Sequence, residues 1–269
     1  MLENLDSSRV WMAAGLTVFA GLSTGFGSLI ALSSRAMNKK FLAMALGFSA
    51  GVMIYVSFVE ILAKARVSFV SVLGDRAGAW ATAGAFFGGV ALIAIIDKLI
   101  PEADNPHEIH HFDAQPGKAP ALQRTGLFVA LVIAIHNFPE GLATFMSALS
   151  DPKLGIMIAV AVALHNIPEG IAVAVPVYYA TGSRKKAFLY SFLSGLFEPL
   201  GALVGFVLLR PFFNDLMFGI LFAVVAGIMV FISIDELVPS AEEYGEHHHC
   251  IYGFVGGMAL MALSLLLFV

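Results

Sequence analysis

Two copies of one six-residue motif hold the side chains of this chain that could do chemistry. The motifs read His-Asn-Phe-Pro-Glu-Gly at 136–141 and His-Asn-Ile-Pro-Glu-Gly at 165–170. In an α-helix, a spacing of four residues places the imidazole and the carboxylate of each motif on one face. Imidazole nitrogens, amide oxygens and carboxylates are ligands for divalent transition metals such as Zn²⁺ and Fe²⁺. Two carboxylates that can bridge would support a site for two metal ions.

Both motifs lie within long apolar stretches of a strongly apolar chain. Of the 269 residues, 59% are hydrophobic and only 13% are charged, and the mean hydropathy is +0.87. This composition is too apolar for a water-soluble globule of this size, so we predict an integral membrane protein. An ionisable side chain at the centre of a bilayer costs at least about 2.5 to 3.5 kcal/mol, so the motifs are interpreted first as functional.

The apolar stretches are long enough for transmembrane helices, which need about 20 residues each. We therefore predict an all-α membrane protein with eight transmembrane helices, folded as one polytopic domain over residues 1–269. The predicted helices cover residues 10–33, 41–63, 78–100, 123–148, 154–180, 187–209, 216–238 and 250–268. Glycines four residues apart, such as Gly84 with Gly88 and Gly201 with Gly205, are expected to let helices pack closely.

The two motifs are expected to lie at one depth in the membrane. A turn near Asp151 joins their helices, with His136 fifteen residues before it and His165 fourteen residues after it. Both positions are then about 22 Å from the turn along the helix axis, so the polar side chains can converge near the midplane. The proline of each motif removes a backbone N–H, and a bend is expected there. Such broken helices are typical of transporter binding sites.

Further polar residues in the predicted spans extend the pattern. Glu198 stands beside proline and glycine inside a helix and is the best candidate for another ligand at the same depth. Met53 offers a thioether about two turns before the first acid of its helix, although a single Met in an apolar helix is usually a core residue. Four acids lie towards helix ends, as interfacial carboxylates or as transient cation sites: Glu60, Asp97, Asp235 and Glu236.

Two polar connections contain histidine and acid together. The connection at about 101–123 contains His107, His110 and His111 and is expected to be mobile, as a weak cation site or a solvated linker. Residues 242–249 combine three glutamates with three histidines. This stretch is interpreted either as a place of metal capture or as a polar connection that serves solubility alone.

Charge on the connections predicts the orientation in the membrane. Lys and Arg number nine on one side and six on the other, with compact clusters at 35–40 and 184–186. The side with nine is predicted to be cytoplasmic, which places both termini outside. The net charge of −4 says little about partners, but the sequence has no basic stripe to bind phosphate, so nucleic acid is not expected as a partner. A single cysteine, Cys250, offers no sulfur cluster for a metal.

Alternatives to metal transport follow from the same residues. Paired His and Glu side chains in membranes also act as proton relays, so a proton-coupled carrier of another substrate stays open. An intramembrane metallohydrolase is less favoured, because the zinc protease signature His-Glu-x-x-His is absent from the sequence. A purely structural polar cluster would bury two glutamates with no Lys or Arg near them in the sequence.

At the two motifs the chain resembles the ZIP family of metal-ion transporters, and over essentially its full length it is similar to the bacterial zinc-uptake branch. The stretches 171–176 and 194–199 and the triplet Gly51-Val52-Met53 also match. The resemblance implies eight helices, both termini outside and a binuclear metal site among the fourth, fifth and sixth helices. Some relatives carry Asp or Gln at the positions of Asn166 and His165, which leaves the choice between zinc and iron open.

The resemblance also implies ligands. One metal ion would be held by Glu140, His165 and Glu169, with His136 and Met53 near it. The second ion would be held by both glutamates as bridges and by three further residues: Asn137, Asn166 and Glu198. The family further suggests Glu60 near the outer entrance and three acids along the inner route: Asp97, Asp235 and Glu236.

The predicted function is uptake of Zn²⁺, and also of Fe²⁺, Mn²⁺, Co²⁺ and Cd²⁺, across a bacterial inner membrane into the cytoplasm. The metal ions are transported substrates, and neither enzyme activity nor a catalytic cofactor is expected. The expected partners are divalent metal ions and the lipid bilayer, and assembly as a homodimer is compatible with the sequence.

Overall fold

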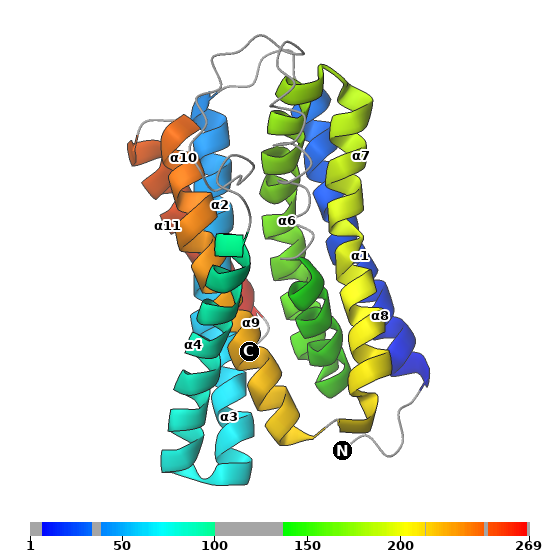
Figure 1. The fold of residues 1–269 in the computed structure, drawn as a ribbon, viewed down its shortest axis with the longest axis vertical. Coiled ribbons are helices and arrows are strands. Elements are labelled where there is room, and N and C mark those ends of the chain that lie inside the picture. Colours follow the sequence, from blue (N-terminus) through cyan, green and yellow to red (C-terminus); the bar gives the residue numbers. More distant parts are fainter. Residues whose placement is uncertain (1–6, 34–38, 100–136, 213, 245–246, 268–269) are drawn as a thin grey trace.

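The computed structural model describes residues 7–33, 39–99, 137–212, 214–244 and 247–267, and every regular element in these ranges is a helix (Figure 1). Residues 137–150 are helical. The other elements are α1 Ser7–Ser33, α2 Lys39–Val56, α3 Leu62–Leu73, α4 Asp75–Leu99, α6 Pro152–Thr181, α7 Arg184–Gly195, α8 Phe197–Leu209, α9 Asp215–Ile232, α10 Val238–Tyr244 and α11 His247–Leu267, with π-helical turns at Ser57–Ile61 and Ser233–Leu237 and a 3₁₀ turn at Arg210–Phe212.

The described residues contain seven helical stretches long and apolar enough to cross a membrane. An all-α, multi-pass membrane protein is therefore the architecture. The predicted helix at 123–148 falls largely outside the described residues, so the number of eight stays a prediction.

The helix predicted at 41–63 is too short. The structure continues it through the π-helical turn and α3 to Leu73. The stretch 64–73 includes no proline or glycine. No helix-breaking residue therefore ends the helix before Gly74. Gly74 then adopts φ 78°, which a residue with a Cβ rarely adopts, and the chain turns into α4.

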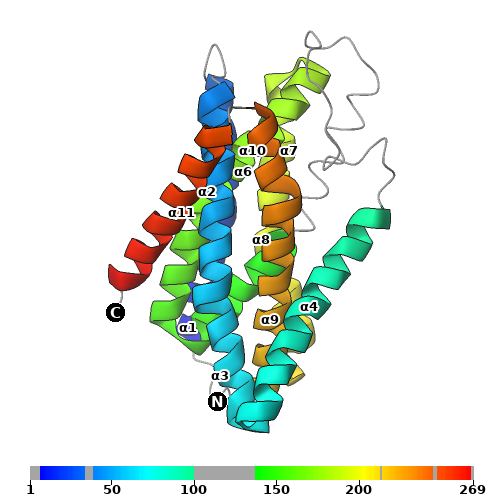
Figure 2. The same ribbon diagram turned by 90° about the vertical axis from the view of Figure 1, so that its left-hand side faces the viewer.

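The helices form two groups (Figures 1 and 2). One group contains α1, α6, α7, α8 and residues 137–150, and the other contains α2, α3, α4, α9, α10 and α11. The groups meet chiefly where α2 packs against α6. Both motifs belong to the first group, so α2 is the main helix that faces them from the other group.

An internal repeat that the motif analysis missed relates α2 to α9. Residues 50–60 and 226–236 share the pattern Ala-Gly-x-Met-x-x-x-Ser-x-x-Glu. A π-helical turn begins at the serine in both copies, and the serine carbonyl accepts the N–H five residues later in both. The two helices run in opposite directions (Figure 2). The repeat is therefore inverted, an arrangement typical of transporters.

The equivalent glycines of the two repeat copies also pack in the same way, each against the backbone of a neighbouring helix. A Cβ on Gly51 would overlap the carbonyl oxygen of Phe254 in α11, and a Cβ on Gly227 would overlap that of Phe86 in α4. Conversely, a Cβ on Gly84 would have no neighbouring atom within 4 Å, and the same holds for Gly88. The expectation that this glycine pair mediates close packing is wrong within the described chain, because α4 turns that face away from its neighbours.

Candidate metal centre

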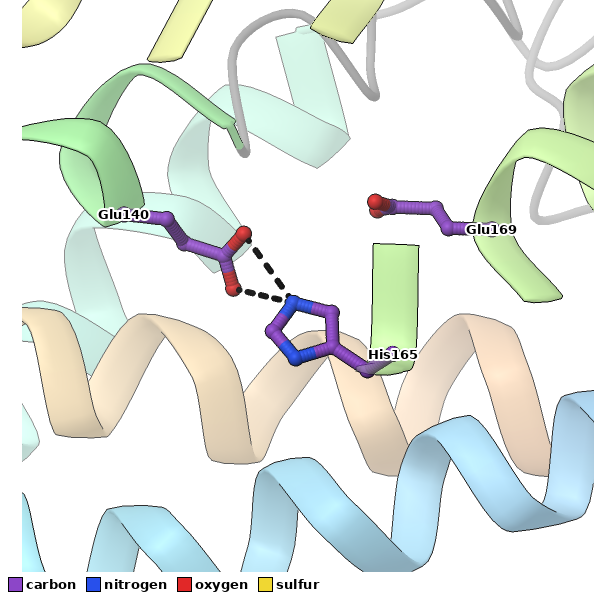
Figure 3. Close-up of side chains that lie close together, drawn as sticks. All are labelled: Glu140, His165 and Glu169. Atoms are coloured by element: carbon purple, nitrogen blue, oxygen red, sulfur yellow. Dashed lines mark hydrogen bonds and ion pairs between the residues drawn. The ribbon is translucent and has the colours of Figure 1, made fainter. Parts of the chain in front are cut away.

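Three of the predicted ligands lie together. Glu140, His165 and Glu169 each offer a ligand atom, and these atoms all lie within 4.8 Å of one another. Glu140 comes from 137–150 and the other two from α6, and Figure 3 shows the imidazole pointing at the Glu140 carboxylate with Glu169 across the gap. His165 Nε2 lies 3.2 Å from Glu140 Oε1 and 3.3 Å from Oε2. All three side chains are at most 3% exposed.

The turn at Asp151 accounts for this meeting of the motifs. Asp151 has an extended backbone and caps α6, because its side chain accepts the Lys153 N–H at 2.9 Å. Pro152 occupies the first helical position, where a missing N–H is harmless. The predicted turn near Asp151 is thus confirmed, and its brevity sets two antiparallel helices side by side. Further on, α6 stays helical through Pro168, although that proline donates nothing to the Leu164 carbonyl.

The two motif asparagines are held by their amide nitrogens. Asn137 Nδ2 donates to the Ser194 carbonyl at 3.1 Å, and Asn166 Nδ2 donates to the Ala20 carbonyl at 2.9 Å and to Glu198 Oε1. Neither Oδ1 atom has a hydrogen-bond partner among the residues that the structure describes. Since both asparagines are fully buried, their carbonyl oxygens are left as acceptors, which suits metal coordination.

Glu198 joins this network from a third helix. It lies in the first turn of α8, where Leu196 separates α7 from α8 and Pro199 has no N–H to offer the preceding turn. The side chain is fully buried, and its Oε2 has no hydrogen-bond partner in the described ranges. The compact three-residue group within 4.8 Å does not include Glu198. Glu198 therefore adjoins that group through Asn166.

Met53 and Ser49 face the group from α2. Ser49 Oγ donates to the His165 carbonyl at 3.3 Å, and Met53 lies one turn further on the same face of α2. Both are fully buried. Ser49 was not anticipated, because its partner is a backbone carbonyl on another helix. His136 lies outside the described residues.

The softer pathway candidates lie apart from the three-residue group. Glu60 is in the first π-helical turn, with Lys64 Nζ 3.9 Å from its carboxylate. Asp235 and Glu236 are in the second π-helical turn, and Asp97 is near the end of α4. A role for these acids in a pathway stays a prediction, although π-helical turns are frequent at functional sites.

The histidine-rich connections are only partly described. His107, His110 and His111 lie outside the described residues. In the second connection, His247 Nδ1 lies 2.7 Å from Glu242 Oε1, and both side chains are exposed. This pair joins α10 to α11 and is too small to enclose an ion by itself.

Comparison with known proteins shows the family of this chain. The family model described as ZIP Zinc transporter matches residues 101–265. A protein of Nitratidesulfovibrio vulgaris called Zinc transporter ZupT is 61% identical over 98% of this chain and 99% of its own length. Proteins with the same name from Streptococcus mutans and Oceanobacillus iheyensis are 59% and 63% identical, over 98% and 94% of this chain and 100% and 96% of their own lengths. With a family model that spans both motifs and relatives about 60% identical over nearly the whole chain, the chain belongs to the ZIP zinc transporter family.

Proposed function

We propose that this protein moves Zn²⁺ into the cytoplasm through a binuclear site at the centre of the membrane. The observation that carries the proposal is the buried group of Glu140, His165 and Glu169, whose ligand atoms lie within 4.8 Å of one another. One imidazole and two carboxylates form a donor set that zinc accepts. The name of the relatives, Zinc transporter ZupT, agrees with this assignment.

The first ion takes Glu140, His165 and Glu169, with Met53 and His136 near it. The second ion takes the two glutamates as bridges, together with Asn137, Asn166 and Glu198. The unpartnered Oδ1 atoms of both asparagines support the second position, because their amide nitrogens are already engaged on backbone carbonyls.

Charge balance favours cations at this place. Three ionised carboxylates carry three negative charges, so one divalent ion leaves one net negative charge and two ions leave one net positive charge. A buried charge is tolerated only when it is compensated. Asn166 contributes no charge where an aspartate would, so a site that holds two ions keeps one net positive charge, which favours release of an ion.

The site is rich in oxygen ligands and contains few nitrogen ligands, so Fe²⁺, Mn²⁺, Co²⁺ and Cd²⁺ are further substrates. The end of the molecule that carries Lys40, Lys98 and 184–186 faces the cytoplasm, by the distribution of positive charge. Both termini then face outward from the inner membrane. Glu60 lies on the outer side of the site, and Asp235 and Glu236 lie on the inner side.

Zinc uptake into proteoliposomes tests the proposal. We expect a Glu140→Gln plus Glu169→Gln double variant to take up Zn²⁺ at the background rate, because the bridging ligands are gone. Glu242→Gln is the matched control, since that exposed acid pairs with the surface residue His247 and lies outside the three-residue group. Full uptake by the correctly inserted double variant would contradict the site. Proton flux without metal uptake in the native protein would favour a proton-coupled carrier instead.

Anomalous X-ray scattering at the zinc edge separates one ion from two. Two peaks near Glu140 and Glu169 are expected, and a single peak would remove the binuclear arrangement while leaving the uptake function intact.

A further inference from the structure

The anchoring of the two motif asparagines is repeated on two helices. Asn166 Nδ2 donates to the Ala20 carbonyl in α1, and Asn137 Nδ2 donates to the Ser194 carbonyl in α7. The residue four positions after Ala20 is Thr24, and the residue four positions after Ser194 is Glu198. Each anchor thus precedes, by about one turn, a buried residue with an oxygen-bearing side chain.

Backbone packing also pairs Thr24 with Glu198. A Cβ on Gly170 would overlap the Thr24 carbonyl oxygen, and a Cβ on Gly141, at the same place in the other motif, would overlap the Glu198 carbonyl oxygen. Gly21 and Gly195 contact each other's carbonyl oxygens reciprocally, where α1 crosses α7. α1 runs opposite to α7 and α8 (Figure 1). Thr24 is therefore the counterpart of Glu198 in an inverted repeat.

The Thr24 hydroxyl differs from several threonine hydroxyls of this chain, although Thr144 Oγ1 and Ser57 Oγ are likewise buried without a hydrogen-bond partner among the described residues. Thr17, Thr82 and Thr181 each donate to the carbonyl four residues earlier, at 2.9, 2.8 and 2.8 Å. For Thr24 that carbonyl belongs to Ala20, which already accepts the helical N–H, Ser23 Oγ and Asn166 Nδ2. Thr24 is 0% exposed, and its Oγ1 has no hydrogen-bond partner within the described chain.

The hydroxyl also lies close to the residue that follows the second anchor. A Cβ on Gly195 would lie 3.0 Å from Thr24 Oγ1, and Gly195 directly follows Ser194, which holds Asn137. An unpaired buried hydroxyl is unfavourable unless something binds it. A bound ion held by the neighbouring asparagine network would give the hydroxyl such a partner.

We infer that Thr24 supplies a neutral oxygen ligand to the second metal position, from α1, as the counterpart of Glu198 on α8. The inference rests on the proposed second position. A carboxylate at 24 would add a fourth negative charge and hold the ions more tightly. Threonine keeps an oxygen there without the charge, and such a ligand favours harder ions such as Mn²⁺ over softer ions such as Cd²⁺.

Two substitutions of Thr24 test this inference on the purified full-length protein. Thr24→Val keeps the shape and removes the hydroxyl, and we expect the affinity for the second Mn²⁺ ion to fall about tenfold, as when one polar contact to a charged group is lost. Thr24→Ser should restore it. Thr17→Val is the matched control, because that buried hydroxyl on the same helix donates within its own turn.

Thr24→Cys allows a measurement that would not change if Thr24 only served packing. A thiolate is a soft ligand, so the variant should bind Cd²⁺ more tightly than the native protein and show thiolate-to-cadmium absorption. Native-like metal binding in Thr24→Val, or a Thr24→Cys variant without a cadmium signal, would overturn the inference. Glu198→Gln separates a failure of this inference from a failure of the proposed second metal position. If this variant also binds two ions as the native protein does, the second metal position itself is contradicted.

Discussion

Replacing Asn166 by aspartate changes one atom of the side chain and removes two hydrogen bonds. The bond to the Ala20 carbonyl is an interhelical contact, worth about 0.6 to 1.7 kcal/mol in membrane proteins. The bond to Glu198 has a carboxylate acceptor and is worth about 1.5 to 3 kcal/mol. The new carboxylate also faces Glu198. Without metal, we expect the free energy of unfolding to fall by roughly 2 to 5 kcal/mol.

Metal should reverse much of this loss, because the added negative charge brings a site with two divalent ions to neutrality. The assay is denaturant unfolding in mild detergent, with and without Zn²⁺. Asn137→Asp is the matched control, since Asn137 makes one described hydrogen bond, to the Ser194 carbonyl, and should lose only about 0.6 to 1.7 kcal/mol without metal. Equal losses in the two variants, or a loss at position 166 that zinc leaves unchanged, would refute the assignment of these hydrogen bonds and of the second ion.

Two further predictions concern packing around the site. Gly170→Ala should destabilise the protein by about 1 to 3 kcal/mol in thermal or denaturant unfolding, because its Cβ would overlap the Thr24 carbonyl; Gly84→Ala, with nothing within 4 Å, should be neutral or stabilising, and the reverse order would contradict the helix packing. Ser49→Ala should cost about 0.6 kcal/mol of stability and weaken Zn²⁺ binding, measured by titration, because the His165 carbonyl loses its contact from α2; unchanged zinc affinity would limit Ser49 to a structural role.

Much of the site could be predicted because its information is local. The motif spacing places ligands on one face of a helix, and the Asp-Pro pair at 151 and 152 marks a short turn, so Glu140 and His165 had to meet. Apolar length alone indicated the seven stretches of the described chain that are long and apolar enough to cross a membrane. These features depend on residues within a few turns of one another.

The rest depends on contacts between residues far apart in the chain. The acceptors for Asn166 and Asn137 are backbone carbonyls of Ala20 and Ser194, which any residue type supplies, so no motif marks them. Thr24 and Ser49 look like ordinary small polar residues until the helices are packed. The end of α3 was missed for another reason: helix continuity depends on the absence of a breaking residue, and hydropathy does not report it.

The inverted repeat has a consequence for how this protein distinguishes the two faces of the membrane. Along the proposed pathway, ions that approach from either side would meet the same sequence of groups, a glutamate and a serine in a π-helical turn and then a methionine. A preference for direction would then reside where the halves differ. Two differences change a charge: Val59 stands where the other half has Asp235, and Thr24 stands where the other half has Glu198. Exchanging such pairs would show how far the direction of transport is determined by the protein and how far by the metal gradient.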